Sequence, residues 1–229
     1  MSAPAERHWL LWFARRGAAS YLSHLDTARA LQRTFARAGI DLALSQGFRP
    51  KVRLSLPLPL PVGAAALEEL AVAEVPEGAP APRRALEALR AVAPDGLPLL
   101  RLDACATRPH PLPRLARYEC ELQGDAGALL GAADWFGAQE SVTVERVSPK
   151  GRRTFDLVKY VKDLAAEAVP DGARLVFAVR HESDGAARPQ EVVDLLAGRA
   201  GCAPVMHRLT RIGVSYEGLP RDMVSGGEE

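Results

Sequence analysis

Apolar residues recur every three or four positions between 23 and 38, and this spacing predicts an amphipathic α-helix. Ser23 is the expected N-cap, and Asp26 three positions later completes a pattern that resembles a capping box. The face expected to pack carries Leu25, Ala28, Leu31 and Phe35. The opposite face carries cations one turn apart, namely Arg29, Arg33 and Arg37. One side of this helix is therefore expected to pack while a row of guanidinium groups faces solvent.

Shorter apolar runs predict strands on both sides of the helix. The prolines at 57, 59 and 61 exclude helix and central strand from their segment, which is expected to be extended. The first half is expected to contain, in order, strand 7–14, helix 23–38, strands 42–44, 52–56 and 67–75, helix 83–93 and strand 97–104. When one of the two short middle strands is merged or demoted, this order becomes βαββαβ.

The second half is interpreted as the same pattern repeated. Its expected order is strand 118–122, helix 126–136, strands 141–147, 155–161 and 174–181, a helix from Arg188 and strand 205–216. A βαββαβ unit forms an antiparallel four-stranded sheet with two helices on one face, the ferredoxin-like arrangement. The predicted fold class is therefore α+β, with two tandem ferredoxin-like domains and antiparallel sheets.

Three prolines within residues 107–114 interrupt the pattern and mark the expected linker. The predicted domains are residues 1–106, which carry the basic segments SHLD and SQGFRP, and residues 115–220. Residues 221–229 are expected to form a flexible tail.

The composition is that of a soluble globular protein, with 48% hydrophobic and 25% charged residues among 229. The N-terminus lacks the pattern of a signal peptide, and no apolar run is long enough to predict a membrane span. The cytoplasm is therefore the expected location, and no membrane partner is expected. The three cysteines, Cys105, Cys120 and Cys202, lie too far apart to indicate a disulfide framework or a zinc ribbon.

The net charge of +1 conceals an uneven distribution along the chain. Residues 1–114 contain 15 Lys and Arg against 10 Asp and Glu, a balance of +5, and the remainder contains 14 against 18, a balance of −4. Residues 15–53 alone hold eight basic and two acidic residues, a balance of +6. A surface for an anionic partner is therefore expected in the first half.

The turn at residues 45–51 combines features that suit a phosphate. It contains Gly47, the aromatic Phe48 and the cations Arg49 and Lys51. The helix start nearby in sequence supplies free N–H groups and a positive dipole end. In a polynucleotide, cations contact phosphates while exposed aromatic side chains stack on bases. The predicted anion- or RNA-binding residues are Ser23, His24, Arg29, Arg33, Arg37, Gly47, Phe48, Arg49, Lys51 and Arg53.

Two of these assignments have plain structural alternatives. Phe48 fits equally well as a core residue beside charges that merely face solvent. His24 falls near Leu31 on the helical wheel, so a partly buried, neutral histidine on the packed side is the favoured interpretation. The competing interpretation makes His24 the general acid/base of a ribonuclease, assisted by Tyr21 or Ser45.

Motifs for several other chemistries are absent from the sequence. The five histidines are scattered without ligand spacing, so no metal site is predicted. There is no GxSxG, no Walker phosphate loop and no GxGxxG after a strand, and no cofactor is expected. The sequence also lacks CxxxCxxC, so the chain cannot by itself hold the iron–sulfur cluster of a radical SAM enzyme in the usual way.

A resemblance to a known family rests on motifs in the first 75 residues. They are Ser23-His24-Leu25-Asp26, Arg37-Ala38-Gly39-Ile40, Ser45-Gln46-Gly47-Phe48-Arg49-Pro50-Lys51 and Leu58-Pro59-Leu60-Pro61-Val62-Gly63. In these motifs the chain resembles the bacterial radical SAM-linked protein family, which is named for its fusion to, or gene proximity with, radical SAM enzymes. Arg49 stands where Asn is common in that family. The resemblance implies partnership with a radical SAM enzyme and implies no established reaction.

The predicted function is that of an accessory protein of a radical SAM system, itself not a radical SAM enzyme. It would bind RNA or present a phosphate-containing substrate to the partner enzyme. One alternative is a metal-independent endoribonuclease that uses His24. Another is a protein–protein adaptor that binds no nucleic acid.

Overall fold

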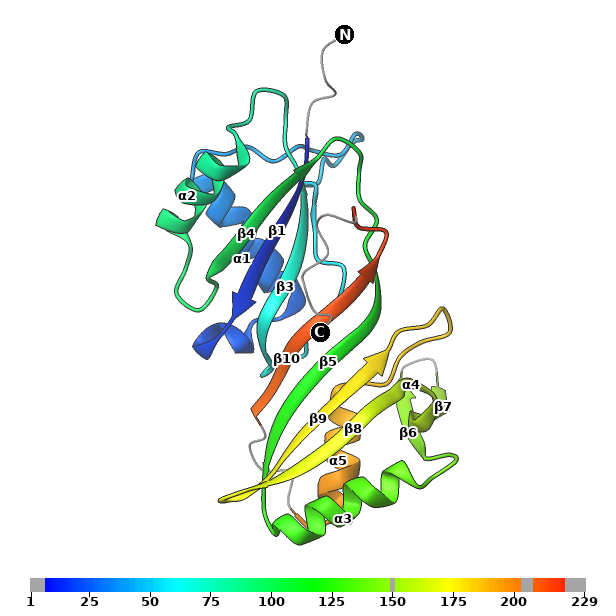
Figure 1. Ribbon diagram of the computed structural model, residues 1–229. Helices are drawn as coiled ribbons and strands as arrows, with labels where there is room; N and C mark the ends of the chain where they lie inside the picture. Colours follow the sequence, from blue (N-terminus) through cyan, green and yellow to red (C-terminus); the bar gives the residue numbers. More distant parts are fainter. Residues whose placement is uncertain (1–6, 149–150, 203–207, 221–229) are drawn as a thin grey trace. The chain divides into compact units, whose positions relative to one another are not determined.

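The computed structural model describes residues 7–148, 151–202 and 208–220, and it shows a mixed α+β protein whose strands are mostly antiparallel (Figure 1). The chain divides into two compact units. Unit 1 comprises Met1–Pro113 and Ser215–Glu229, and unit 2 comprises Arg114–Val214. The predicted linker 107–114 ends inside a strand, and the predicted tail 221–229 lies outside the described residues.

Unit 1 contains a sheet with two helices packed against it. Its elements are β1 (His8–Arg15), the 3-10 helix η1 (Gly17–Tyr21), α1 (His24–Arg37), β2 (Leu54–Ser55), β3 (Ala65–Glu74), α2 (Pro82–Val92) and β4 (Leu99–Cys105). The sheet order is β4-β1-β3, with β2 paired to the other side of β3, and all these pairs are antiparallel. Apart from η1, the elements follow the βαββαβ order that the sequence predicts.

The two short middle strands differ from their prediction. Residues 42–44 form no strand, and only an isolated bridge joins Leu44 to Val52. The strand predicted at 52–56 is shortened to Leu54–Ser55, because prolines follow it closely. Backbone hydrogen bonds still hold this region to the end of β3, since Ala43 N donates to Glu74 O (2.7 Å) and Glu74 N donates to Arg53 O (3.0 Å).

The packed stripe of α1 is rotated from its predicted position. Its buried residues are Thr27, Ala30, Leu31, Thr34 and Phe35. Leu25, which the sequence places on this face, is 56% exposed, because it lies about 120° around the helix from Leu31 at 100° per residue. The two threonines are tolerated inside because their hydroxyls donate to the carbonyls of Ser23 and Ala30, each at 2.9 Å.

The sheet face away from the helices is also closed by packing. Leu10, Trp12 and Val72 are buried there against Tyr216 and other residues near the end of the chain. The Trp12 ring meets the Tyr216 ring edge-on at 6.4 Å, and its indole N–H donates to Asp103 at 3.1 Å. The open sheet face expected of a ferredoxin-like domain is therefore occupied in unit 1.

Arg15 is buried at the end of β1, next to the start of α1 and the proline-rich segment. Its guanidinium donates to the carbonyls of Leu22 (3.0 Å), Pro61 (2.5 Å) and Ala64 (3.2 and 2.8 Å). These bonds connect β1 to the start of α1 and to the proline-rich segment, neither of which belongs to the sheet. A charged side chain therefore fixes two segments that the backbone ladder leaves unpaired.

Unit 2 is organised around a sheet in the order β10-β5-β9-β8. Its elements are β5 (Leu112–Gln123), α3 (Ala126–Gly137), β6 (Thr143–Ser148), β7 (Gly151–Asp156), α4 (Leu157–Tyr160), β8 (Val161–Val169), β9 (Gly172–Arg180), α5 (Pro189–Arg199) and β10 (Arg208–Glu217). The first residues of β5 and the last residues of β10 belong to unit 1.

The prediction for the middle of unit 2 is wrong in one respect. The segments expected as sheet strands at 141–147 and 155–161 fall mainly on β6, β7 and α4, and β6 and β7 form a separate two-stranded hairpin. The sheet strand is β8, which the sequence analysis missed. Its residues VKDLAAEAV lack a continuous apolar pattern because β8 is an edge strand, and a register shift between Lys162 and Ala165 accompanies a positive φ at Asp163.

Replacing the buried guanidinium tests its role in stability. Arg15→Met removes the donors to three carbonyls and is expected to lower the free energy of unfolding by roughly 3 kcal/mol or more. Urea denaturation followed by circular dichroism measures this change. Arg16→Met is the matched control because Arg16 is exposed, and its expected effect is below about 0.5 kcal/mol. Equal effects of the two substitutions would contradict the assigned role.

Candidate nucleic-acid interface

Residues 45–51, here named the Phe48 loop, project from the edge of unit 1. The loop is closed at its base by two hydrogen bonds, in which Ser45 N donates to Lys51 O (2.8 Å) and Lys51 N donates to Ser45 Oγ (2.9 Å). Gly47 has a φ of 127°, a conformation that favours glycine, and so permits the turn at the tip. The sequence thus forms a loop that displays its middle residues and anchors its ends.

Phe48 is fully exposed on this loop, at 109% of its reference area. This exposure excludes the alternative in which Phe48 belongs to the core. Burying a phenyl ring is worth about 1.5–3 kcal/mol, so a molecule that covered Phe48 would gain a contribution of this size. The neighbouring Arg49 and Lys51 are exposed as well.

A groove of about 350 Å³, here named the loop groove, lies beside the base of the loop. Its lining includes the cations Lys51, Arg53 and Arg108 and the imidazole of His8. The one acid in the lining is Glu74, which forms an ion pair with Arg53 at 3.1 Å. Among the described residues, two of the three cations in the groove are therefore not offset by an acid in its lining.

His8 is the titratable group best placed to respond to an anion in this groove. Burial lowers the pKa of His8, and the positive charges of Arg108, Arg7 and Arg53 lower it further, against the opposing effect of Glu74. These effects favour the neutral imidazole, and a bound anion would favour its protonation.

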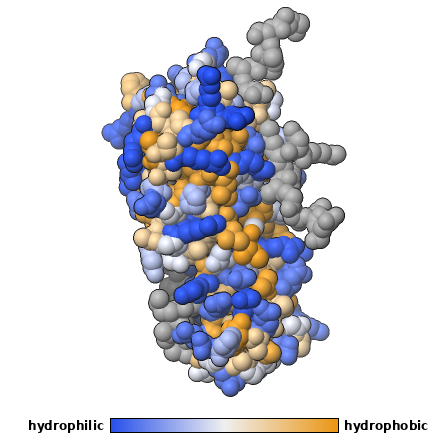
Figure 2. Space-filling view, turned by 60° about the vertical axis from the view of Figure 1, so that its left-hand side comes forward, coloured by the Kyte–Doolittle hydropathy of each residue, from blue (hydrophilic) through white to orange (hydrophobic). Residues whose placement is uncertain are grey.

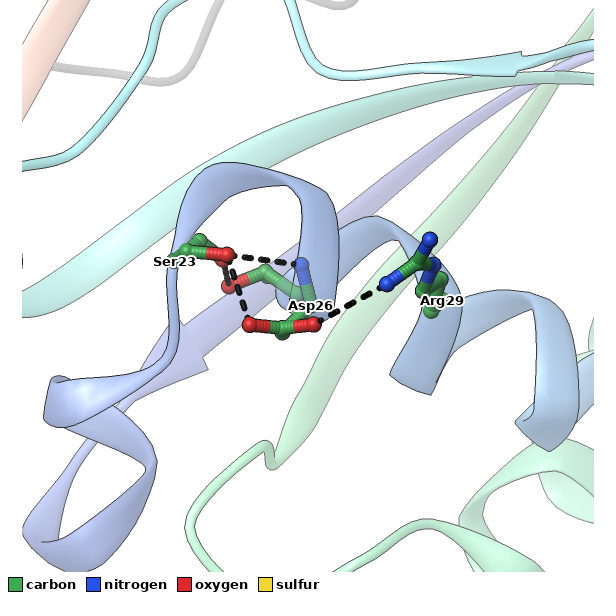
Figure 3. Close-up of polar contacts among 4 residues, drawn as sticks. Ser23, Asp26 and Arg29 are labelled. Carbon is green, nitrogen blue, oxygen red and sulfur yellow. Dashed lines mark hydrogen bonds and ion pairs between the residues drawn. The ribbon is translucent and has the colours of Figure 1, made fainter.

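The first turn of α1 is satisfied by its own residues (Figure 3). Ser23 Oγ accepts from Asp26 N at 3.1 Å and donates to Asp26 Oδ2 at 2.7 Å, which confirms the predicted cap. The other carboxylate oxygen of Asp26 lies 3.5 Å from the Arg29 guanidinium. Because Asp26 already supplies negative charge here, an external anion at this helix start would compete with it.

His24 is exposed, so the prediction of a histidine buried on the packed side is wrong. His24 is the first residue of α1. It lines a cavity of only about 10 Å³ together with Arg15, Thr27 and Glu69. That volume holds about one water molecule and no substrate.

The residues proposed for ribonuclease chemistry lie at two ends of unit 1. His24 and the 68% exposed Tyr21 lie near Arg15 at the end of β1, whereas Ser45 shares the loop groove with His8 at the start of β1. The length of β1 separates these ends by roughly 23 Å. Ser45 therefore does not lie within hydrogen-bond reach of His24.

The predicted row of arginines on α1 is exposed but does not line the loop groove. Arg33 and Arg37 line a different groove beside η1 and the turn before β4, and Arg29 pairs with Asp26. The ten predicted binding residues thus fall in three places rather than on one face. Gly47, Phe48, Arg49, Lys51 and Arg53 are the ones that lie together.

His8, Glu74 and Arg108 are the ionisable residues of the groove that sequence analysis missed. His8 is the first residue of a strand whose other residues have the pattern of a buried strand, and Arg108 lies in the expected linker. They meet because β1 pairs with both β3 and β4, which sets His8 opposite Glu74 and Cys105. The residues around His8 and Arg108 contain no local pattern that predicts this strand pairing.

Unit 2 contains a larger groove of about 530 Å³ that includes Arg114, Arg180 and His181. Burial lowers the pKa of His181, and the charge of the buried Arg211 adds to this effect. Arg180 lies 3.6 Å from Glu182 in the same lining. The groove has no exposed aromatic side chain in its lining, which distinguishes it from the Phe48 loop.

The described residues hold no group of three or more His, Cys, Asp or Glu placed to bind a metal ion. In the same parts of the chain, no helix has the length and apolar character needed to cross a membrane.

Residues 8–189 match the model of a bacterial family described as "Uncharacterized protein conserved in bacteria (DUF2344)". The chain belongs to this family. The match covers most of unit 1 and extends through the β6–β7 hairpin to the start of α5. It makes no statement about radical SAM enzymes, so that part of the sequence resemblance stays a prediction.

No curated protein matches the chain. Among solved structures, the chain is similar to one titled "Crystal Structure of an Unknown Protein from Galdieria sulphuraria", at 10% identity over 92% of this chain and 98% of that one. The TM-score of 0.27 is too low to support an inference about fold or function.

Titration of His8 tests whether the loop groove receives an anion. In the free protein the His8 pKa should lie below its ordinary value near 6.5, and a bound oligonucleotide should raise it. NMR titration of the imidazole C–H signals, assigned with His8→Gln, measures both values. An unchanged His8 pKa in the presence of saturating U-rich RNA would contradict an anion in this groove.

The exposure of His24 gives a second prediction. His24→Ala should change the free energy of unfolding by less than about 0.5 kcal/mol and should leave any affinity for RNA unchanged. Thermal melting and a binding titration measure these quantities. A stable variant that binds RNA but loses an RNA-cleaving activity of the wild-type protein would instead support the ribonuclease alternative.

Proposed function

We propose that this protein binds single-stranded RNA through the Phe48 loop and the loop groove. The observation that carries the proposal is the fully exposed Phe48 on an anchored loop, flanked by Arg49 and Lys51. Stacking of one base on an aromatic side chain contributes about 1–3 kcal/mol to binding, and nearby cations contact the phosphates.

The dimensions and charge of the groove support the same proposal. Its volume of about 350 Å³ is in the range of small-ligand sites, roughly 300–1,000 Å³. A base stacked on Phe48 would leave the adjoining phosphates near Lys51, Arg53 and Arg108. Single-stranded RNA is favoured over a duplex because only unpaired bases offer their faces to an aromatic ring.

The fold is compatible with RNA binding at the Phe48 loop. We infer that both units are variants of the ferredoxin-like fold, because the orders β4-β1-β3-β2 and β10-β5-β9-β8 correspond element by element. In unit 2 the β6–β7 hairpin is an insertion between the first helix and the second strand of that pattern. The exposed Phe48 loop provides an accessible binding surface in unit 1.

The proposed biological role rests on the family resemblance in the sequence. We propose a cytoplasmic accessory protein that holds RNA, or another phosphate-containing substrate, for a radical SAM enzyme. The ribonuclease alternative is less well supported because His24 and Ser45 lie at opposite ends of β1. The adaptor alternative predicts no RNA affinity at all.

Substitution of Phe48 tests the proposal directly. Phe48→Ala should weaken binding of a fluorescent U-rich RNA of about 10 nucleotides by roughly 5- to 150-fold, because one stacked base is lost. Fluorescence anisotropy measures the affinity, and thermal melting should be unchanged because Phe48 has no core contacts to lose.

Two comparisons make this result specific. Phe48→Trp should retain affinity because it keeps an aromatic face, whereas Val62→Ala, an exposed apolar change elsewhere in unit 1, should have no effect. Lys51→Gln should reduce the slope of log affinity against log salt by roughly 0.7. Absence of RNA binding by the wild-type protein, or equal affinity of wild-type and Phe48→Ala proteins, would reject the proposal.

A further inference from the structure

A second groove in unit 1 has a different chemistry from the loop groove. This helix groove, of about 390 Å³, runs between α1 on one side and η1 with the turn before β4 on the other. Its lining is Ala18, Ala19, Leu22, Ala30, Arg33, Thr34, Arg37, Pro94, Asp95 and Leu97. Figure 2 turns the side of unit 1 that carries α2 toward the viewer and shows apolar atoms between hydrophilic side chains there.

The walls of the helix groove are held in place by the backbone. Arg16 N donates to Gly96 O at 2.8 Å, and Ala14 N donates to Pro98 O at 2.9 Å. A Cβ on Gly96 would lie 2.6 Å from Arg16 O and 2.9 Å from the Ala19 Cβ, so η1 and the turn approach as closely as glycine allows. The backbone therefore sets the positions of the groove walls, and the groove does not depend on one side-chain rotamer.

The charged groups of the groove are unevenly balanced. Arg33 and Arg37 are exposed on α1, and neither forms an ion pair with any residue that the structure describes. Asp95 is the one acid in the lining, and it forms no ion pair with them in the same set of residues. Two guanidinium groups thus border an aliphatic floor with at most one acid to offset them.

We propose that the helix groove is a docking site for an acidic, amphipathic segment of another protein. Apolar side chains of that segment would cover Ala18, Leu22 and Pro94, which are exposed or half-buried, and its carboxylates would pair with Arg33 and Arg37. Guanidinium groups form bidentate pairs with carboxylates, and they are enriched at protein interfaces where an apolar centre has a charged rim. This site is separate from the Phe48 loop and does not depend on RNA binding there.

The chemistry of the floor favours a protein partner over RNA. Proteins hold unpaired bases on aromatic rings or guanidinium planes and by hydrogen bonds to the base edges. Among the described residues, the uncharged lining of the helix groove is made of alanine, leucine, proline and one threonine, and it contains no aromatic side chain. Aliphatic side chains of a partner would bury this surface, whereas a base would find no ring to stack on.

The test uses two synthetic peptides of about 15 residues, long enough to form a helix when bound. The acidic peptide has leucine at helical spacing and glutamate elsewhere, and the basic peptide has lysine in place of glutamate. Fluorescence anisotropy with the full-length protein should show binding of the acidic peptide and at least about tenfold weaker binding of the basic one. A wild-type protein that binds neither peptide, or both equally, would overturn the proposal.

Variants locate the binding in the groove. Ala18→Trp places a large side chain in the groove from an exposed position, and the double substitution Arg33→Glu with Arg37→Glu reverses the charge at its rim. Each of these variants should bind the acidic peptide at least about tenfold more weakly than the wild-type protein. Arg83→Glu with Arg84→Glu on α2 is the matched control with the same change in net charge, and it should have less than about a twofold effect.

The same variants separate this proposal from RNA binding. Ala18→Trp and the double substitution on α1 should leave the affinity for U-rich RNA unchanged, and Phe48→Ala should leave peptide affinity unchanged. An equal loss in the α2 control would show that net charge alone drives peptide binding. A loss of RNA affinity in the α1 variant without a loss of peptide affinity would assign the helix groove to RNA and overturn the proposal.

Discussion

The buried guanidinium of Arg15 is the interaction on which the architecture of unit 1 depends. Its hydrogen bonds to Leu22, Pro61 and Ala64 hold the start of α1 and the proline-rich segment against the end of β1. Prolines cannot donate to a ladder, so a side-chain donor is the available means of fixing such a segment. Both grooves lie on elements that this bonding orients, because η1 and α1 flank one of them and β3, which follows the prolines, lines the other.

The separation of the two grooves follows from the direction of α1. The helix leaves the end of β1 that holds Arg15, and the chain returns toward the end that holds His8 before it forms the Phe48 loop. Residues that are close in sequence are thereby distributed over two surfaces of different chemistry. One surface combines an aromatic ring with cations, and the other combines aliphatic side chains with two guanidinium groups that form no ion pair with the residues that the structure describes.

The sequence predicted the elements that carry strong local signals. Ser23 and Asp26 located the start of α1, and prolines and glycines located the ends of α2. It failed where tertiary pairing overrides local pattern, as at the edge strand β8 and in the rotated packed face of α1, where two threonines replace the expected Leu25. The Phe48 loop was recognisable from its composition, whereas His8 and Arg108 were not, because strand pairing alone brings them to the groove.

The closed sheet face of unit 1 has a consequence for the order of folding during synthesis. Trp12 and Leu10 pack against Tyr216 and Leu219, which are separated from them by the whole of unit 2 along the chain. A nascent chain therefore completes unit 2 before the residues that finish unit 1 leave the ribosome. Until then the apolar surface around Trp12 lacks its native cover, so unit 1 remains dependent on residues that are translated after unit 2.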